Sequence, residues 1–98
     1  MVIDINKVSN PSIVRKKFAN YKGSDDARLE LSEKSDKKYK VIYNGKTIHF
    51  GSNLADFTKH GDETKRKAYL ARSGGIKGNW KNDKYSPNNL SRHLLWAL

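Results

Sequence analysis

The dipeptide Asn44-Gly45 stands between two runs in which apolar and polar residues alternate. Asn-Gly favours a two-residue type I′ turn, because both central residues of that turn need a positive φ. The alternation on either side is typical of strands that bury one face. The sequence therefore predicts a β-hairpin whose register pairs Tyr39 with Phe50.

This register divides the hairpin side chains between two faces. The core face is expected to hold Tyr39, Val41, Ile48 and Phe50, joined by Leu29 and Leu31 from a further alternating run at 27–32. The open face is expected to present Lys38, Lys40, Ile42, Thr47 and His49. Because sequential strands usually pair with each other, the three runs predict an antiparallel three-stranded meander.

Two proline-led segments predict helices near the two ends of the chain. Asn10-Pro11 and Ser86-Pro87 each place a capping side chain before a proline at the first helical position. Two interpretations of the first helix stay open: it packs on the body, or it is an arm that becomes ordered only on binding. The last helix is expected to close the core with leucines that recur every four residues, Leu90, Leu94 and Leu98.

A longer, basic helix is expected to begin at Asp62, whose carboxylate suits the positive end of a helix dipole. It is expected to stop at Gly74-Gly75. A narrow stripe is expected to pack on the sheet and consists of Thr64, Ala68 and Ala71. The outward face is expected to carry Lys65, Tyr69 and Arg72.

These segments together predict an α+β fold, in which a small antiparallel three-stranded sheet packs against the basic helix and the C-terminal helix. We expect an N-terminal arm with a short helix at 1–26 and a single basic α+β domain at 27–98. The chain has no cysteine, which excludes disulfides and thiolate metal sites. No apolar run is long enough to predict a membrane span, and the first residues do not resemble a secretory signal.

Charge is the strongest indication of function. The 98 residues carry 20 Lys and Arg against 10 Asp and Glu, a formal net charge of +10. So large a positive charge on a small body attracts polyanions, of which nucleic acid is the commonest. The alternatives are a basic protein that is merely soluble and one that docks on an acidic protein.

Ten residues are candidates for contact with nucleic acid. The expected phosphate contacts are Lys38, Lys40, Lys65, Arg66, Lys67, Arg72, Lys77, Lys81 and Lys84, with Trp80 as an inserting or stacking residue. Lysine predominates, and it lacks the bidentate base recognition of arginine, so we expect little sequence specificity. The alternatives are that Trp80 folds back to cap the core and that the helix lysines form a solvated face.

Signals for catalysis are weak. His60 with Asp62 and Glu63 is the one cluster with the chemistry to hold a divalent metal, as a nuclease would, and ordinary helix capping is the competing interpretation. The glycine-rich run at 74–78 lacks the spacing of a phosphate-binding P-loop, and no serine has a nucleophile elbow around it. We expect no enzyme activity, no cofactor and no metal.

Several motifs, in this order and spacing, resemble small basic proteins encoded by large double-stranded DNA viruses of protists. They are KYKVIYNGKTIHFG (38–51), DFTKHGD (56–62), RKAYLAR (66–72) and SRHLLW (91–96). The resemblance covers roughly 27–98 and implies a viral, virion-associated protein. A looser similarity, in size, charge and the order of hairpin and helix, links the chain to the archaeal monomeric chromosomal protein, which is histone-like and bends DNA.

The leading hypothesis from charge and resemblance is a non-enzymatic, sequence-tolerant DNA-binding protein that compacts or organises a viral genome in the virion. Its expected partners are double-stranded DNA and other virion proteins, with no membrane, and the chain is expected to be a monomer or a weak homodimer. The alternative hypothesis is a structural virion protein whose basic face docks an acidic capsid or core protein.

Overall fold

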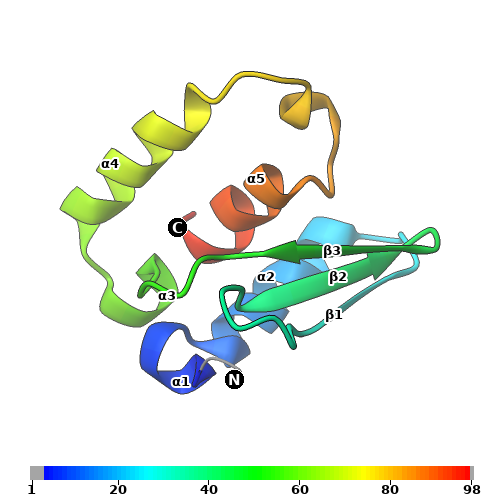
Figure 1. Ribbon diagram of the computed structural model, residues 1–98, viewed down its shortest axis with the longest axis horizontal. Helices are drawn as coiled ribbons and strands as arrows, with labels where there is room; N and C mark the ends of the chain where they lie inside the picture. Colours follow the sequence, from blue (N-terminus) through cyan, green and yellow to red (C-terminus); the bar gives the residue numbers. More distant parts are fainter. Residues whose placement is uncertain (1–3, 98) are drawn as a thin grey trace.

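A computed structural model describes residues 4–97 and has the α+β architecture that the sequence predicts (Figure 1). Its order along the chain is α1 (Ile5–Val8), α2 (Pro11–Lys22), β1 (Ala27–Leu31), β2 (Tyr39–Tyr43), β3 (Lys46–Phe50), α3 (Phe57–His60), α4 (Glu63–Gly74), the 3₁₀ turn η1 (Trp80–Asn82), α5 (Pro87–Leu90) and the π-helical turn η2 (Ser91–Leu95). No helix among the described residues is both long and apolar enough to cross a membrane.

The three strands form one antiparallel sheet in the order β1-β2-β3. The hairpin register is confirmed throughout, from Tyr43 opposite Lys46 at the turn to Tyr39 opposite Phe50 at the far end. Asn44 and Gly45 have φ values of 55° and 77°, as a type I′ turn requires. The local turn chemistry thus sets the alignment of the whole hairpin.

One face of the sheet packs against α2 and α5, and the buried core lies between these layers (Figure 1). The core residues are Val14, Phe18, Ala27, Tyr39, Val41, Phe50, Tyr85, Leu90, Leu94 and Leu95. Leu31 departs from expectation and is 48% exposed at the end of the edge strand β1. The other predicted core-face residues, Leu29 and Ile48, are partly buried against the core.

Helix α2 packs on the body and is not a detached arm. The Asn10 side chain caps it by accepting a hydrogen bond from the Ile13 amide, and Gly23 ends it at a φ of 56°. Val14 and Phe18 are buried in the same core as the strands. The hydrophobic core therefore extends across the predicted boundary between 26 and 27.

The C-terminal helix closes the core as predicted. Ser86 caps α5 by accepting a hydrogen bond from the Asn89 amide, and the chain then continues into η2. Leu90, Leu94 and Leu95 are fully buried. The predicted core residue Leu98 lies outside the described residues.

Helix α4 has the predicted ends but not the predicted packing. Asp62 caps it and Gly75 follows its last residue. The stripe of Thr64, Ala68 and Ala71 is exposed and does not pack on the sheet. These side chains are too small to compete with the leucines of α5 and η2, which already cover the sheet, so α4 stands away from it on the far side of α5 (Figure 1).

A buried polar network ties the N-terminal segment, the sheet and α3 together. The Lys38 ammonium lies 3.4 Å from Asp56 Oδ2, and both side chains are buried. Asp56 Oδ1 caps α3 by accepting hydrogen bonds from the amide and hydroxyl of Thr58. Ser9 lies 3.1 Å from the Thr58 hydroxyl and accepts a hydrogen bond from the Tyr39 hydroxyl.

The chain passes this network at Gly51, which has a φ of 83°. A Cβ at this position would lie 3.0 Å from Leu95 Cδ1 and 3.2 Å from Lys38 Cβ. Glycine is required there both by the positive φ and by the close approach of η2 to the end of β3.

We expect the protein to lose stability in alkali as the pH rises from about 10 to about 12. Burial raises the pKa of Tyr39 to about 12, whereas an exposed tyrosine in the unfolded chain titrates near 10. The unfolded state therefore releases a proton first in this interval, and the free energy of unfolding falls by roughly 3 kcal/mol from this residue alone. Urea unfolding at a series of alkaline pH values measures the fall.

Tyr39→Phe provides the control for this prediction. The variant removes the titrating hydroxyl and keeps the ring, so its free energy of unfolding should fall less steeply over the same interval. Some fall remains, because burial also raises the pKa values of Tyr21, Tyr69 and Tyr85. Lys38 acts in the opposite sense but only below its unfolded pKa near 10.5, since burial lowers its pKa. An unchanged alkaline slope in the variant would contradict the role given to Tyr39.

Candidate nucleic-acid interface

Lys38 is not on the open face of the hairpin, and this prediction is wrong. Strand β2 begins one residue later, and the Lys38 amide donates hydrogen bonds to the Phe50 and Gly51 carbonyls at the open end of the hairpin. Its side chain turns inward to Asp56, leaving the residue 3% exposed. A buried ammonium with a carboxylate partner is not available to a phosphate.

Three further candidates have carboxylate partners. These pairs are Lys40 Nζ with Glu33 at 2.8 Å, Arg66 Nε with Glu63 at 3.1 Å, and Lys84 Nζ with Asp25 at 2.7 Å. Exposed pairs of this kind contribute little to stability, but each places a negative charge beside the cation. The pair of Lys40 with Glu33 therefore makes the open hairpin face less positive than its lysines alone predict.

The remaining five phosphate candidates are exposed, and within the described part of the chain no carboxylate lies at ion-pair distance from them. They lie on α4, on the glycine-rich loop that follows it and on η1, in an arch on the far side of α5 from β1 (Figure 1). We call them the α4–loop surface, in which Lys67 projects from the side of α4 opposite to Lys65 and Arg72: Lys65, Lys67, Arg72, Lys77 and Lys81. The phosphate candidates that have no ion-pair partner therefore lie away from the hairpin.

Trp80 is half-buried and lies within this loop. Its indole Nε1 donates a hydrogen bond to the Ile76 carbonyl at 2.7 Å. The Lys81 ammonium and the Arg92 guanidinium each lie 5.5 Å from the ring centroid. Trp80 is outside the cluster of buried core residues, so it does not cap the core, and its partly exposed ring adjoins a free cation.

Arg92 holds the C-terminal end of α4, a role that the sequence did not predict. Its Nη1 donates to the Leu70 carbonyl at 2.7 Å and to the Ser73 hydroxyl at 2.6 Å. Asn88 also donates to the Ser73 carbonyl at 3.0 Å. The last carbonyls of a helix lack partners within it, so an arginine amid buried leucines was the available signal for such a contact.

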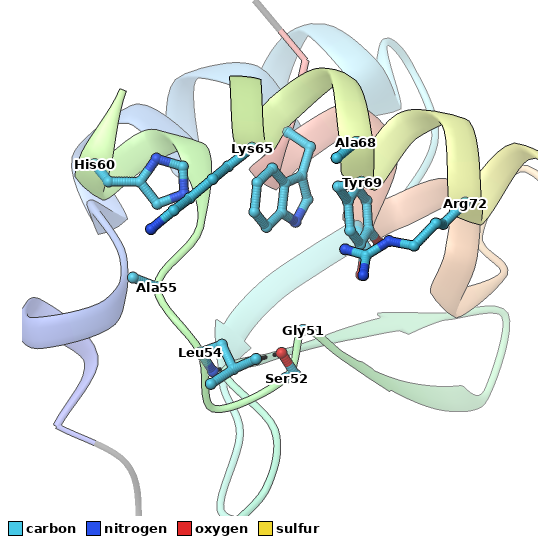
Figure 2. Close-up of a pocket in the computed structure, with 11 residues that line it drawn as sticks. Gly51, Ser52, Leu54, Ala55, His60, Lys65, Ala68, Tyr69 and Arg72 are labelled. Carbon is cyan, nitrogen blue, oxygen red and sulfur yellow. Dashed lines mark hydrogen bonds between the residues drawn. The ribbon is translucent and has the colours of Figure 1, made fainter. Parts of the chain in front are cut away.

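A pocket of about 850 Å³ lies between α4 and the segment 51–55. Its lining residues are Gly51, Ser52, Leu54, Ala55, His60, Lys65, Ala68, Tyr69, Arg72, Ser91 and Trp96. Figure 2 shows Lys65, Tyr69 and Arg72 on the side of α4 that faces this segment. Lys65 and Arg72 are exposed, as predicted, whereas Tyr69 is half-buried in the wall of the pocket.

Aromatic rings form one wall of the pocket. Tyr69 and Trp96 are stacked, with centroids 4.4 Å apart and planes 15° from parallel. The His60 ring lies 5.4 Å from the Trp96 ring. Burial raises the pKa of Tyr69, so its phenol is neutral at physiological pH and adds no negative charge to the pocket.

The three residues of the metal hypothesis make local contacts at the entrance to α4, and His60 Nε2 has no hydrogen-bond partner among the described residues. His60 Nδ1 accepts a hydrogen bond from the Asp62 amide at 2.9 Å. Asp62 Oδ1 accepts from the Thr64 and Lys65 amides, and Glu63 pairs with Arg66. Within residues 4–97 no three His, Asp or Glu side chains are grouped as metal ligands would be. The arrangement is that of helix capping.

The comparisons with known proteins bear on part of this surface. The model of a family of unknown function (DUF5754) matches residues 27–73. This stretch holds the sheet, α3 and nearly all of α4, including the buried pair of Lys38 and Asp56, and it ends before the loop that carries Trp80. Searches of curated proteins and of solved structures find no match.

Proposed function

We propose that the protein binds double-stranded DNA with little sequence preference and acts, without catalysis, as an architectural protein that helps organise a viral genome. The observation that carries the proposal is the α4–loop surface. Five exposed cations without ion-pair partners in the described chain follow one another along one helix and one loop. The viral setting rests on the resemblance of the motifs.

The chemistry of this surface favours the phosphate backbone over the bases. Lysine presents a compact charge that neutralises a phosphate and releases its counterions, without the forked geometry that recognises guanine. The glycine-rich loop lets Lys77 and Lys81 follow a backbone whose path varies. Trp80 supplies a ring beside these charges, suited to pack against the edge of a groove.

The proposal predicts a steep dependence of affinity on salt. Neutralisation of five phosphates gives a slope of about −4.5 in a plot of log K against log salt, so affinity falls roughly 500-fold between about 50 and 200 mM salt. A mobility-shift titration with a mixed-sequence duplex measures the slope. A second duplex of unrelated sequence should bind within a few-fold.

The alternative hypothesis, docking on an acidic protein, predicts no general affinity for duplex DNA in this experiment. No shift of duplex at low salt, or a flat salt slope, would contradict DNA binding. A strong preference for one duplex sequence would contradict the proposed recognition of the backbone.

A further inference from the structure

The pocket beneath α4 is positively charged. Lys65 and Arg72 are seven residues apart, about two helical turns, and so project from the same side of α4. None of the eleven lining residues is Asp or Glu, and within the described residues neither cation has an ion-pair partner. Figure 2 shows both side chains extended over the pocket. The site therefore favours an anionic ligand, and the Arg72 guanidinium matches the geometry of a phosphate.

The rest of the pocket is suited to a flat apolar group. Tyr69 and Trp96 form its aromatic wall. Leu54 lies at its opposite side and is 71% exposed, more than any other large hydrophobic residue that the structure describes (Figure 2). A ligand that covers the exposed leucine and aromatic surface around this pocket removes apolar area from water, which favours binding.

From these two features we propose that the pocket binds a nucleotide unit. The base packs between the aromatic wall and Leu54, and the phosphate is held by Arg72 and Lys65. The volume of about 850 Å³ lies within the range of small-molecule sites. Two sources supply this chemistry: a free mononucleotide, or an unpaired nucleotide of a single strand.

This site goes beyond the proposed binding of duplex DNA. A base within a duplex is stacked and paired, so it cannot enter the pocket without being flipped out. Lys65 and Arg72 belong to both surfaces, but Trp96, Tyr69 and Leu54 belong to the pocket alone. Duplex binding and occupancy of the pocket can therefore succeed or fail independently.

Tryptophan fluorescence provides the test. The chain has two tryptophans, so Trp80→Phe leaves Trp96, which lines the pocket, as the only one. This variant is titrated with AMP, with adenosine and with a short single-stranded oligothymidylate at low salt. Stacking or contact of a base is expected to quench Trp96.

Arg72→Gln in the same background is expected to weaken binding about tenfold, the loss typical of one charged hydrogen bond. Arg28→Gln removes the same group from an exposed site on β1 and should leave binding within about twofold, below the size of one such contact. Adenosine should bind about tenfold more weakly than AMP, because it lacks the phosphate. Circular dichroism checks that each variant is folded.

Each outcome decides the proposal. Quenching by AMP that depends on Arg72 identifies a free nucleotide as a ligand, and quenching by the oligothymidylate alone identifies a strand. If neither AMP nor the oligothymidylate quenches Trp96, the proposal is overturned, whatever the duplex titration shows. Where AMP binds, equal binding of AMP and adenosine overturns it as well, and so does equal loss in the Arg72 and Arg28 variants.

Discussion

Replacing Asp56 by asparagine is expected to lower the free energy of unfolding by about 3–5 kcal/mol, the cost of leaving a buried charge without its partner. The substitution keeps the size of the side chain and an oxygen that can cap α3. It removes the charge that faces the Lys38 ammonium at 3.4 Å. Burial already lowers the pKa of Lys38, and the Asp56 carboxylate is what opposes this shift. Urea unfolding monitored by circular dichroism measures the loss.

The double variant Lys38→Met with Asp56→Asn separates the pair from the shape of the site. When both charges are removed, no ion is left unpaired, and the double variant should recover at least half of the loss. Glu63→Gln breaks the exposed pair with Arg66 and should cost only a few tenths of a kcal/mol. A cost below about 1 kcal/mol for Asp56→Asn would contradict the importance of the buried pair.

Replacing Lys67, Lys77 and Lys81 by glutamine is expected to weaken duplex binding several hundred-fold. Each lost phosphate contact removes the release of about 0.9 counterion. Near 0.1 M salt this lowers the affinity for the duplex roughly eightfold, so the loss of three contacts lowers it about 500-fold. These lysines do not line the pocket beneath α4, so AMP binding should survive. Fluorescence anisotropy with a labelled duplex measures the affinity.

The matched control removes three exposed lysines from other parts of the molecule, Lys7, Lys34 and Lys46. Both triple variants carry the same net charge of +7, from 10 − 3. If net charge alone attracts the duplex, the two variants will bind equally. If the α4–loop surface binds it, the control should lose less than about tenfold, the effect of a weaker general field.

Local chemistry was sufficient to predict most of the fold. The Asn44-Gly45 turn fixes the hairpin register, because both residues adopt the positive φ that this turn requires. Asn10, Asp62 and Ser86 each cap the helix that the sequence places after them. Such signals act over a few residues and do not depend on the rest of the chain.

Contacts between distant segments were beyond this kind of prediction. The side of the hairpin on which Lys38 lies is decided by Asp56, which comes from a loop that alternation does not describe. The orientation of α4 depends on Arg92 and on a core already filled by Leu90, Leu94 and Leu95. A sequence pattern shows which side chains share a helix face, but not which face meets the body.

The candidate site was predicted in part. The sequence indicated cations on α4 and beside Trp80, and the structure shows that five of them remain exposed without an ion-pair partner among the described residues. The sequence also suggested an open basic hairpin face. In the structure, however, Lys38 is buried and Lys40 pairs with Glu33. The pocket had no sequence signal, since Leu54 and Trp96 meet α4 only through folding.

The most direct test of the α4–loop surface is a comparison of salt slopes for duplex binding. Wild type and the two triple-glutamine variants are measured with one labelled duplex across the same salt series. We predict a slope of about −4.5 for wild type, a similar slope for the control variant, and about −1.8 for the variant without Lys67, Lys77 and Lys81. Equal slopes for the two variants would contradict the assignment of DNA binding to this surface.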